Sequence, residues 1–155
     1  MVLKLISEGK SIVIAPKNGK RTIAKADNVF NYIDSDFTTW GTDVEGKSTS
    51  ETPVSIYEMK KDANFSQMFN LISKNLEKLR LGQDQIISFV EEHKDWLHPE
   101  GWATLFLFKE NDKFFVALVS TDSVGEPGVD ICYFEDKNVC PANDHLRVVV
   151  PQLSS

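Results

Sequence analysis

The stretch that decides the fold is Ala103-Thr104-Leu105-Phe106-Leu107-Phe108 and, after the polar turn Lys109-Glu110-Asn111-Asp112-Lys113, the run Phe114-Phe115-Val116-Ala117-Leu118-Val119. Both runs have the length of a strand and are almost entirely apolar. A strand that is apolar on both faces must be covered on both faces. We therefore predict two adjacent strands in the middle of a sheet, with other elements packed against it.

Two amphipathic helices are expected before these strands. Asn64 and Gln67 have the spacing of a capping box, and an apolar helical stripe follows over residues 65–80: Phe65, Met68, Phe69, Ile72, Leu76 and Leu79. Beyond Gly82 a second stripe predicts a helix that Pro99 stops, with Ile86, Phe89, Val90, His93 and Leu97 on one face. The short link predicts an αα-hairpin, which we expect on one face of the sheet.

The other elements are predicted from shorter patterns. Asn18-Gly19 lies between the β-branched segments 11–15 and 21–25, which predicts a β-hairpin, and residues 28–33 have the spacing of a short helix behind Asp27. A polar loop over residues 41–53 precedes the remaining predicted strands, which are residues 53–59, 129–134 and 146–150.

The resulting element order is ββαβααββββ. It predicts an α+β fold with a mainly antiparallel sheet of about five to seven strands, in a single globular domain of residues 1–155.

Charge is distributed unevenly along the chain. The first 60 residues carry eight basic and eight acidic side chains, whereas the remaining 95 carry nine and fifteen, which accounts for the net charge of −6. An acidic body repels phosphates, so nucleic acid is disfavoured as a partner. No apolar stretch is long enough to cross a bilayer, and the segment from Met1 to Lys10 does not have the pattern of a secretory signal, so we expect a cytoplasmic protein without membrane association.

The principal candidate site is the corner between the second helix and the first central strand. Trp96, His98, Glu100 and Trp102 lie within seven residues there, and we expect Trp40 from the polar loop region to join them in an aromatic recess that binds a ligand or partner. His98 is expected to be exposed near Asp95 and Glu100, which would raise its pKa. The alternatives are that the tryptophans only seal the core and that His98 is a solvated helix-end residue.

The cysteines and the other histidines give weaker candidates. Cys140 and His145 suggest a thiolate–imidazole pair oriented by Asp144, although neighbours in sequence seldom adopt that geometry. Imidazole and thiolate groups suit zinc, and the chain offers five of them, but no close ligand pair has the usual spacing: His93, His98, Cys132, Cys140 and His145. His93 is expected as a core or boundary residue bonded to a neighbouring carbonyl, and the thiols of Cys132 and Cys140 are expected to be reduced. We expect neither a metal nor a cofactor.

These observations favour a small non-catalytic binding or interaction module that contacts a protein partner or itself. No nucleophile elbow, phosphate-binding loop or dinucleotide fingerprint is present in the sequence. The rival function is a hydrolase or transferase that uses His98 with Glu100, or Cys140 with His145. A third hypothesis, a regulator that mimics nucleic acid, requires the later carboxylates to lie along one face.

Overall fold

Eight strands form one mixed sheet in the computed structural model of this protein, which describes residues 1–153. The order across the sheet is β1-β4-β8-β5-β6-β7-β3, with β2 paired to the first residues of β4. The pairs β5–β8 and β3–β7 are parallel, and the other pairs are antiparallel. The strands are β1 (Leu3–Leu5), β2 (Val13–Ile14), β3 (Tyr32–Ile33), β4 (Thr52–Met59), β5 (Thr104–Glu110), β6 (Lys113–Thr121), β7 (Pro127–Tyr133) and β8 (Arg147–Pro151). The predicted α+β class with a mainly antiparallel sheet is confirmed.

The central hairpin formed by β5 and β6 matches the prediction. Its register pairs Glu110 with Lys113, so Asn111 and Asp112 form a two-residue turn with φ values of 53° and 62°. Asn and Asp tolerate this left-handed conformation better than other residues with a Cβ, and such turns follow the natural twist of paired strands. The local sequence is therefore sufficient to specify this register.

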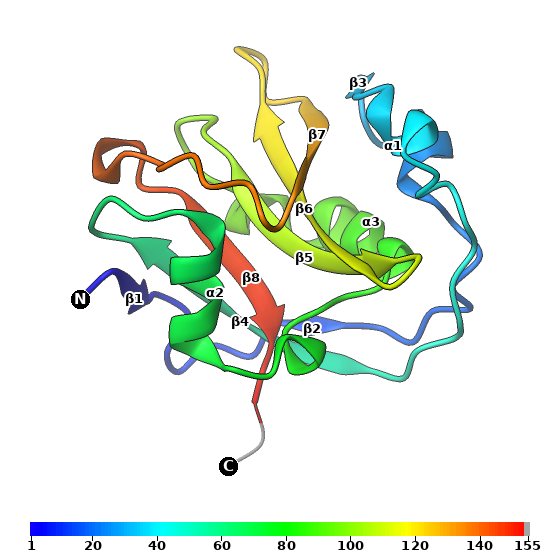
Figure 1. Cartoon of the computed structure of the whole chain (residues 1–155). Coiled ribbons are helices and arrows are strands. Elements are labelled where there is room, and N and C mark those ends of the chain that lie inside the picture. The colour runs from blue at the N-terminus through cyan, green and yellow to red at the C-terminus, as the bar shows by residue number, and fades with distance from the viewer. Residues whose placement is uncertain (154–155) are drawn as a thin grey trace.

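The helices are α1 (Asp36–Thr39), α2 (Phe65–Ile72) and α3 (Gln83–Glu92), with short 3₁₀ turns η1 (Ile23–Lys25), η2 (Leu76–Lys78), η3 (Lys94–Trp96) and η4 (Ala142–Asp144). Helices α2 and α3 lie on opposite faces of the sheet, α2 in front and α3 behind in Figure 1. The expectation of an αα-hairpin on one face is wrong. No helix of residues 1–153 combines the length and apolar character that a membrane span needs.

Alternate residues of the central strands supply the two cores that separate the helices. Leu105 and Leu107 of β5 face α2, together with the buried Phe65, Met68 and Phe69. Phe106 and Phe108, one residue out of phase, face α3 and its buried Ile86, Phe89 and Val90. Because both faces of the sheet are apolar, a separate layer is needed on each side, and the two helices provide one each.

Helix α2 ends earlier than the sequence predicts. The capping box is present, since Asn64 Oδ1 accepts from Gln67 N and Gln67 Oε1 accepts from Asn64 N, both at 2.9 Å. Ser73 is extended, however, and its Oγ accepts a hydrogen bond from Asn75 N at 3.0 Å. These local side-chain bonds compete with the helix and end it at Ile72. Leu79 still packs with the α2 core from the segment beyond η2.

The predicted hairpin of residues 11–15 and 21–25 does not form. Val13 and Ile14 pair with β4 instead, and the backbone N–H groups of Gly19 and Ile23 donate to Asp84 Oδ2 and Gln83 Oε1 of α3. Side chains of a helix that is distant in sequence thus accept hydrogen bonds from backbone N–H groups of the segment that was expected to form the hairpin.

The predicted helix at residues 28–33 is also wrong. Tyr32 and Ile33 form β3, and the neighbouring Asn31 N and Asp34 N donate to Pro127 O and Val129 O along β7. The carbonyl groups of β7 accept hydrogen bonds from these N–H groups. In a short helix, the N–H groups of the first turn would have no partner in the helix and would bond to solvent.

Candidate functional site

The corner residue His98 is buried, with 6% of its surface exposed. Its Nδ1 accepts a hydrogen bond from Glu100 N at 3.1 Å, and its own N–H donates to Thr104 Oγ1 at 3.1 Å. Burial lowers the pKa of His98, and the positive charge of Arg147 lowers it further. The expectation of an exposed histidine with a raised pKa is therefore wrong, because packing and Arg147 outweigh Glu100.

The tryptophans of the corner differ in their environments. Trp96 is half-buried against the α3 side of the core, and Arg147 Nη1 donates to Trp96 O at 3.0 Å and to Leu97 O at 3.2 Å. Trp102 is 48% exposed, and Glu100 is exposed as well. The corner is thus a closed structural turn with one exposed ring beside one exposed carboxylate.

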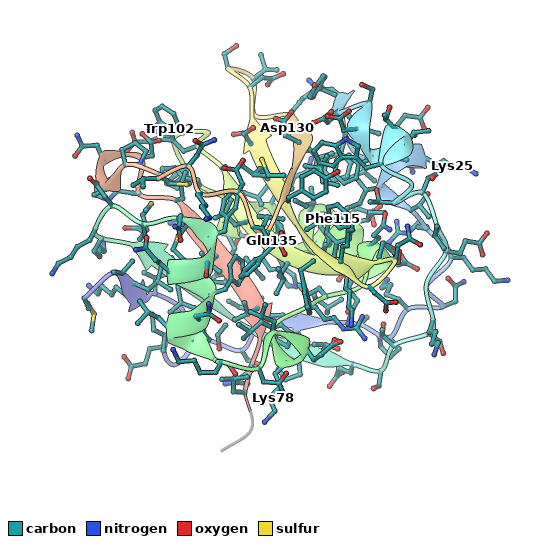
Figure 2. All side chains as sticks on the ribbon, in the orientation of Figure 1. Lys25, Lys78, Trp102, Phe115, Asp130 and Glu135 are labelled. Atoms are coloured by element: carbon teal, nitrogen blue, oxygen red, sulfur yellow. The ribbon has the colours of Figure 1, made fainter. Side chains whose placement is uncertain are left out.

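Trp40 does not join the corner. Its ring stacks on Tyr133 with centroids 4.2 Å apart and lies 6.3 Å from Phe115. Phe115 is near the start of β6, while Thr121 at the end of β6 is bonded to Gly101 of the corner. Thr121 lies six positions along the strand from Phe115, roughly 20 Å, and Figure 2 accordingly shows Trp102 and Phe115 well apart. The five predicted residues therefore form no single recess.

Trp40 belongs instead to a surface along the outer edge of β7, which we call the β7 rim: Tyr32, Asp34, Asp36, Trp40, Asp130 and Tyr133. The chain from Tyr32 to Trp40 follows β7 along its length. Tyr32 pairs with Gly128, Asp34 Oδ2 accepts from Ile131 N at 3.3 Å, and Trp40 stacks on Tyr133. The carboxylate of Asp34 thereby caps the edge of the sheet beyond the two-residue strand β3, which protects it from pairing with another strand.

The β7 rim combines exposed aromatic rings with negative charge. Tyr32 is 55% and Tyr133 42% exposed. The negative charge of Asp130 raises the pKa of Tyr32, while burial and the charge of Asp34 raise the pKa of Asp130. Sequence reasoning missed Tyr32, Asp130 and Tyr133, although the polar Asp130 between buried Val129 and Ile131 is a signal of a second, less covered strand face.

The cysteines have the properties of buried thiols. Cys132 and Cys140 are free and half-buried against the α2 side of the core. Burial raises the pKa of Cys132 to about 11 and also raises the pKa of Cys140. His145 is exposed, and no hydrogen bond joins it to Cys140 within residues 1–153. A protonated thiol without a neighbouring base is a poor nucleophile.

His93 lies where the sequence predicts, at the boundary of the core. Its Nε2 is 2.9 Å from Val13 O, and its ring lies 5.3 Å from that of Phe89. In the described part of the chain, no group of three or more His, Cys, Asp or Glu side chains is arranged to hold a metal ion.

A groove of about 790 Å³ is present, and none of the predicted site residues lines it. One wall is the chain from Val44 to Ser50, the other is the segment from Glu77 to Leu81, and the floor includes Gln83-Asp84-Gln85 and the end of β5. We call it the α3 groove. Comparison with protein-family models, curated proteins and solved structures gives no match to this chain.

Proposed function

We propose that this protein is a non-catalytic binding module that holds a basic segment of a protein partner on the β7 rim. The observation that carries the proposal is the stack of Trp40 on Tyr133 at 4.2 Å, at one end of β7. Tyr32, which pairs with Gly128 near the other end of the strand, is a further exposed ring of the rim. Stacked rings are rigid, so a partner that covers them loses little conformational entropy. Aromatic anchors of this kind dominate the energy of many protein interfaces.

The carboxylates of the rim give the proposed partner its charge. Asp34, Asp36 and Asp130 all act on the hydroxyl of Tyr32, so negative charge is concentrated where the ring is exposed. Lysine and arginine side chains gain from both features, because they pair with carboxylates and also bind over aromatic faces. The net charge of −6 favours the approach of a basic partner over longer distances.

The rival enzymatic function has less support. In the first pair, His98 is buried and cannot act as an accessible base. In the second pair, the raised pKa of Cys140 leaves little thiolate near neutral pH. Neither pair lines the α3 groove. We keep a cytoplasmic location as part of the proposal, since two free cysteines are consistent with a reducing compartment.

The proposal is tested with a fluorescently labelled peptide of alternating lysine and serine and with its glutamate–serine counterpart. We expect the basic peptide alone to bind, and its affinity to fall as salt screens the carboxylates. Tyr32→Ala and Asp36→Asn change exposed or half-exposed rim side chains, so the variants should fold normally. Each should weaken binding roughly fivefold or more.

Trp102→Ala is the matched comparison, because Trp102 is a large and similarly exposed ring outside the β7 rim. Anisotropy titrations that give the wild-type affinity for Trp102→Ala and a reduced affinity for Tyr32→Ala support the rim. The reverse result would move the binding surface to Trp102 and Glu100. Equal binding of both peptides, unaffected by any of these variants, would contradict the proposal.

A further inference from the structure

The turn that leads from η3 into β5 requires a neutral histidine. His98 Nδ1 accepts a hydrogen bond from Glu100 N at 3.1 Å, so this nitrogen carries no proton. His98 is 6% exposed, which leaves its ring little contact with water. A proton on Nδ1 would be a second donor facing the N–H of Glu100, with no acceptor between the two. The charged form of His98 and the hydrogen bond that shapes the turn therefore exclude one another.

A row of polar side chains crosses the sheet beside this histidine. The register of the strands places Glu58 opposite Arg147 and Arg147 opposite Thr104, with β8 between β4 and β5 (Figure 1). Paired residues on neighbouring strands share one face of a sheet. Thr104 Oγ1 accepts from His98 N at 3.1 Å, so the row reaches the turn. Arg147 is therefore positioned between the carboxylate of Glu58 and the corner.

Arg147 holds the backbone that leads into the turn. Its Nη1 donates to Trp96 O at 3.0 Å and to Leu97 O at 3.2 Å. Its Nε, by contrast, is buried without a hydrogen-bond partner among residues 1–153 and lies 3.7 Å from Glu58 Oε2. Buried N–H groups are nearly always paired, and a shift of less than about 1 Å would bring Nε within hydrogen-bond distance of that carboxylate. The guanidinium group thus has a second arrangement within reach, an ion pair with Glu58.

The charges around His98 oppose its protonation in the closed corner. Burial is the largest effect and lowers the pKa of His98, and Arg147 lowers it further. Glu58 and Glu100 act in the opposite direction, and His145 adds a smaller lowering effect. A ring that leaves the corner escapes this environment and regains the ordinary pKa of about 6.5. Acid therefore favours any arrangement that releases the ring.

Glu58 keeps its negative charge in the same pH range. Burial acts against the charged form of this carboxyl group, but Lys60, at 2.6 Å, and Arg147 outweigh burial and lower the pKa of Glu58 below its ordinary value of 4.5. Just below pH 6.5, where a released imidazole takes up a proton, Glu58 is still an anion. It can therefore accept the guanidinium group when the corner no longer does.

We propose that the corner, residues 96–102, is a proton-sensitive switch. With His98 neutral the corner is closed, held by the bond from Glu100 N and by Arg147. When Nδ1 takes up a proton from solvent, the bond to Glu100 N breaks and the turn opens. Arg147 then moves from the two backbone carbonyls of the corner to Glu58. This inference is independent of the proposed function, since it uses the corner and not the β7 rim.

The test follows the backbone amides of residues 96–102 by NMR between about pH 7.5 and 5, on either side of the ordinary pKa of histidine. The ratio of open to closed molecules should rise by up to about tenfold per pH unit below about pH 6.5. We expect shifts and faster hydrogen exchange in this segment, after correction for the intrinsic effect of pH on exchange, while the amides of β5 and β6 stay protected. If the corner loses protection only together with β5 and β6, or not at all, the proposal is overturned.

His98→Asn separates protonation from shape. An asparagine side chain accepts a hydrogen bond from the N–H two residues on, as His98 Nδ1 does from Glu100 N, but it does not titrate. This variant should keep the corner closed over the whole pH range. His145→Asn, at an exposed histidine, is the matched control and should retain the transition, moved slightly to higher pH because the charge of His145 opposes the proton. An unchanged transition in His98→Asn would refute the role of His98.

Glu58→Gln tests the second position of Arg147 and is also the second variant in case His98→Asn alters folding. Without the carboxylate the open form loses its ion pair, so the transition should move to lower pH by about half a unit or more. The side-chain Nε–H signal of Arg147 should shift with the transition in the wild type and stay constant in Glu58→Gln. Glu100→Gln, which removes another carboxylate that acts on His98, should leave the Arg147 signal as in the wild type. An Arg147 signal that does not respond to pH in the wild type would contradict the movement of Arg147 to Glu58.

Discussion

Nε of Arg21 donates to Oδ1 of Asp84 at 2.7 Å, and this contact ties the N-terminal segment to the first turn of α3. The other oxygen of Asp84 accepts from Gly19 N, and the carboxylate is 4% exposed. A carboxylate in the first turn also interacts favourably with the helix dipole. One buried side chain thereby fixes a segment that lies more than sixty residues away in sequence.

Asp84→Ala should cost about 3 kcal/mol in the free energy of unfolding, because it leaves Gly19 N without a partner and removes the charge that faces Arg21. Denaturant titration measures this change. Asp95→Ala, which removes an exposed aspartate beyond the same helix, is the control and should stay within about 0.5 kcal/mol of wild type. Equal stabilities of the two variants would show that Asp84 does not hold the segment.

The α2 core gives a second prediction. Phe69 is fully buried and packs 6.0 Å from the ring of Phe134. Phe69→Ala should destabilise the protein by about 3–5 kcal/mol. Leu71→Ala on the same helix removes a side chain that is 61% exposed, and a change within about 0.5 kcal/mol is expected. A loss below about 1 kcal/mol for Phe69→Ala would mean that α2 contributes little to the core.

Elements specified by neighbouring residues could be predicted from the sequence, and elements specified by distant contacts could not. The apolar run Phe114–Val119 is enough to predict a strand, and the pair Asn64 and Gln67 is enough to predict the start of a helix. The Asn18-Gly19 turn also has a strong local pattern, yet Asp84 and Gln83 determine its surroundings. The β7 rim depends on contacts such as that between Asp34 and Ile131, which no local pattern specifies.

The candidate corner shows the same limit. The clustering of Trp96, His98 and Trp102 is visible in the sequence, but the burial of His98 and the nearby charge of Arg147, which lowers its pKa, are not. The sequence alone places Glu100 close to His98 and so predicts a raised pKa for His98. Desolvation lowers this pKa, and it is the larger effect. Exposure of a side chain near a turn therefore cannot be inferred from the turn alone.

His98 predicts a dependence of stability on pH. Its folded pKa lies below the ordinary value of 6.5, so the unfolded chain binds more protons between the two pKa values. The stabilising contribution is present above about pH 6.5 and is lost as the pH falls through the folded pKa, with a slope of at most about 1.4 kcal/mol per pH unit. His98→Asn should remove this part of the slope in denaturant titrations between about pH 7.5 and 4.5. His145→Asn, which changes an exposed histidine, should retain it.

The two thiols should react slowly in the folded protein. A pKa of about 11 for Cys132, against an ordinary value of 9.0, leaves roughly one hundredth of the usual thiolate near neutral pH. A thiol reagent should therefore modify both cysteines rapidly only after unfolding, with two thiols counted per chain. A thiol that reacts in the native protein as fast as free cysteine would contradict the expectation that both thiols are buried and protonated. The single variants Cys132→Ser and Cys140→Ser would show which cysteine reacts.

Gly19 should be the least replaceable glycine, because the chain that forms one wall of the α3 groove lies directly against it. A Cβ at Gly19 would lie 2.2 Å from Lys47 O, and the residue has φ +80°. Gly125 has nearly the same φ, +83°, but a Cβ there would meet no atom within 4 Å, so Gly125→Ala isolates the cost of the backbone conformation. We expect about 1 kcal/mol for Gly125→Ala and roughly 3 kcal/mol or more for Gly19→Ala. Denaturant titration of both variants measures the difference, and faster amide exchange at residues 44–49 of Gly19→Ala would locate it in the wall. If the two alanine variants are equally stable, the close approach of Gly19 and Lys47 does not hold that wall in place.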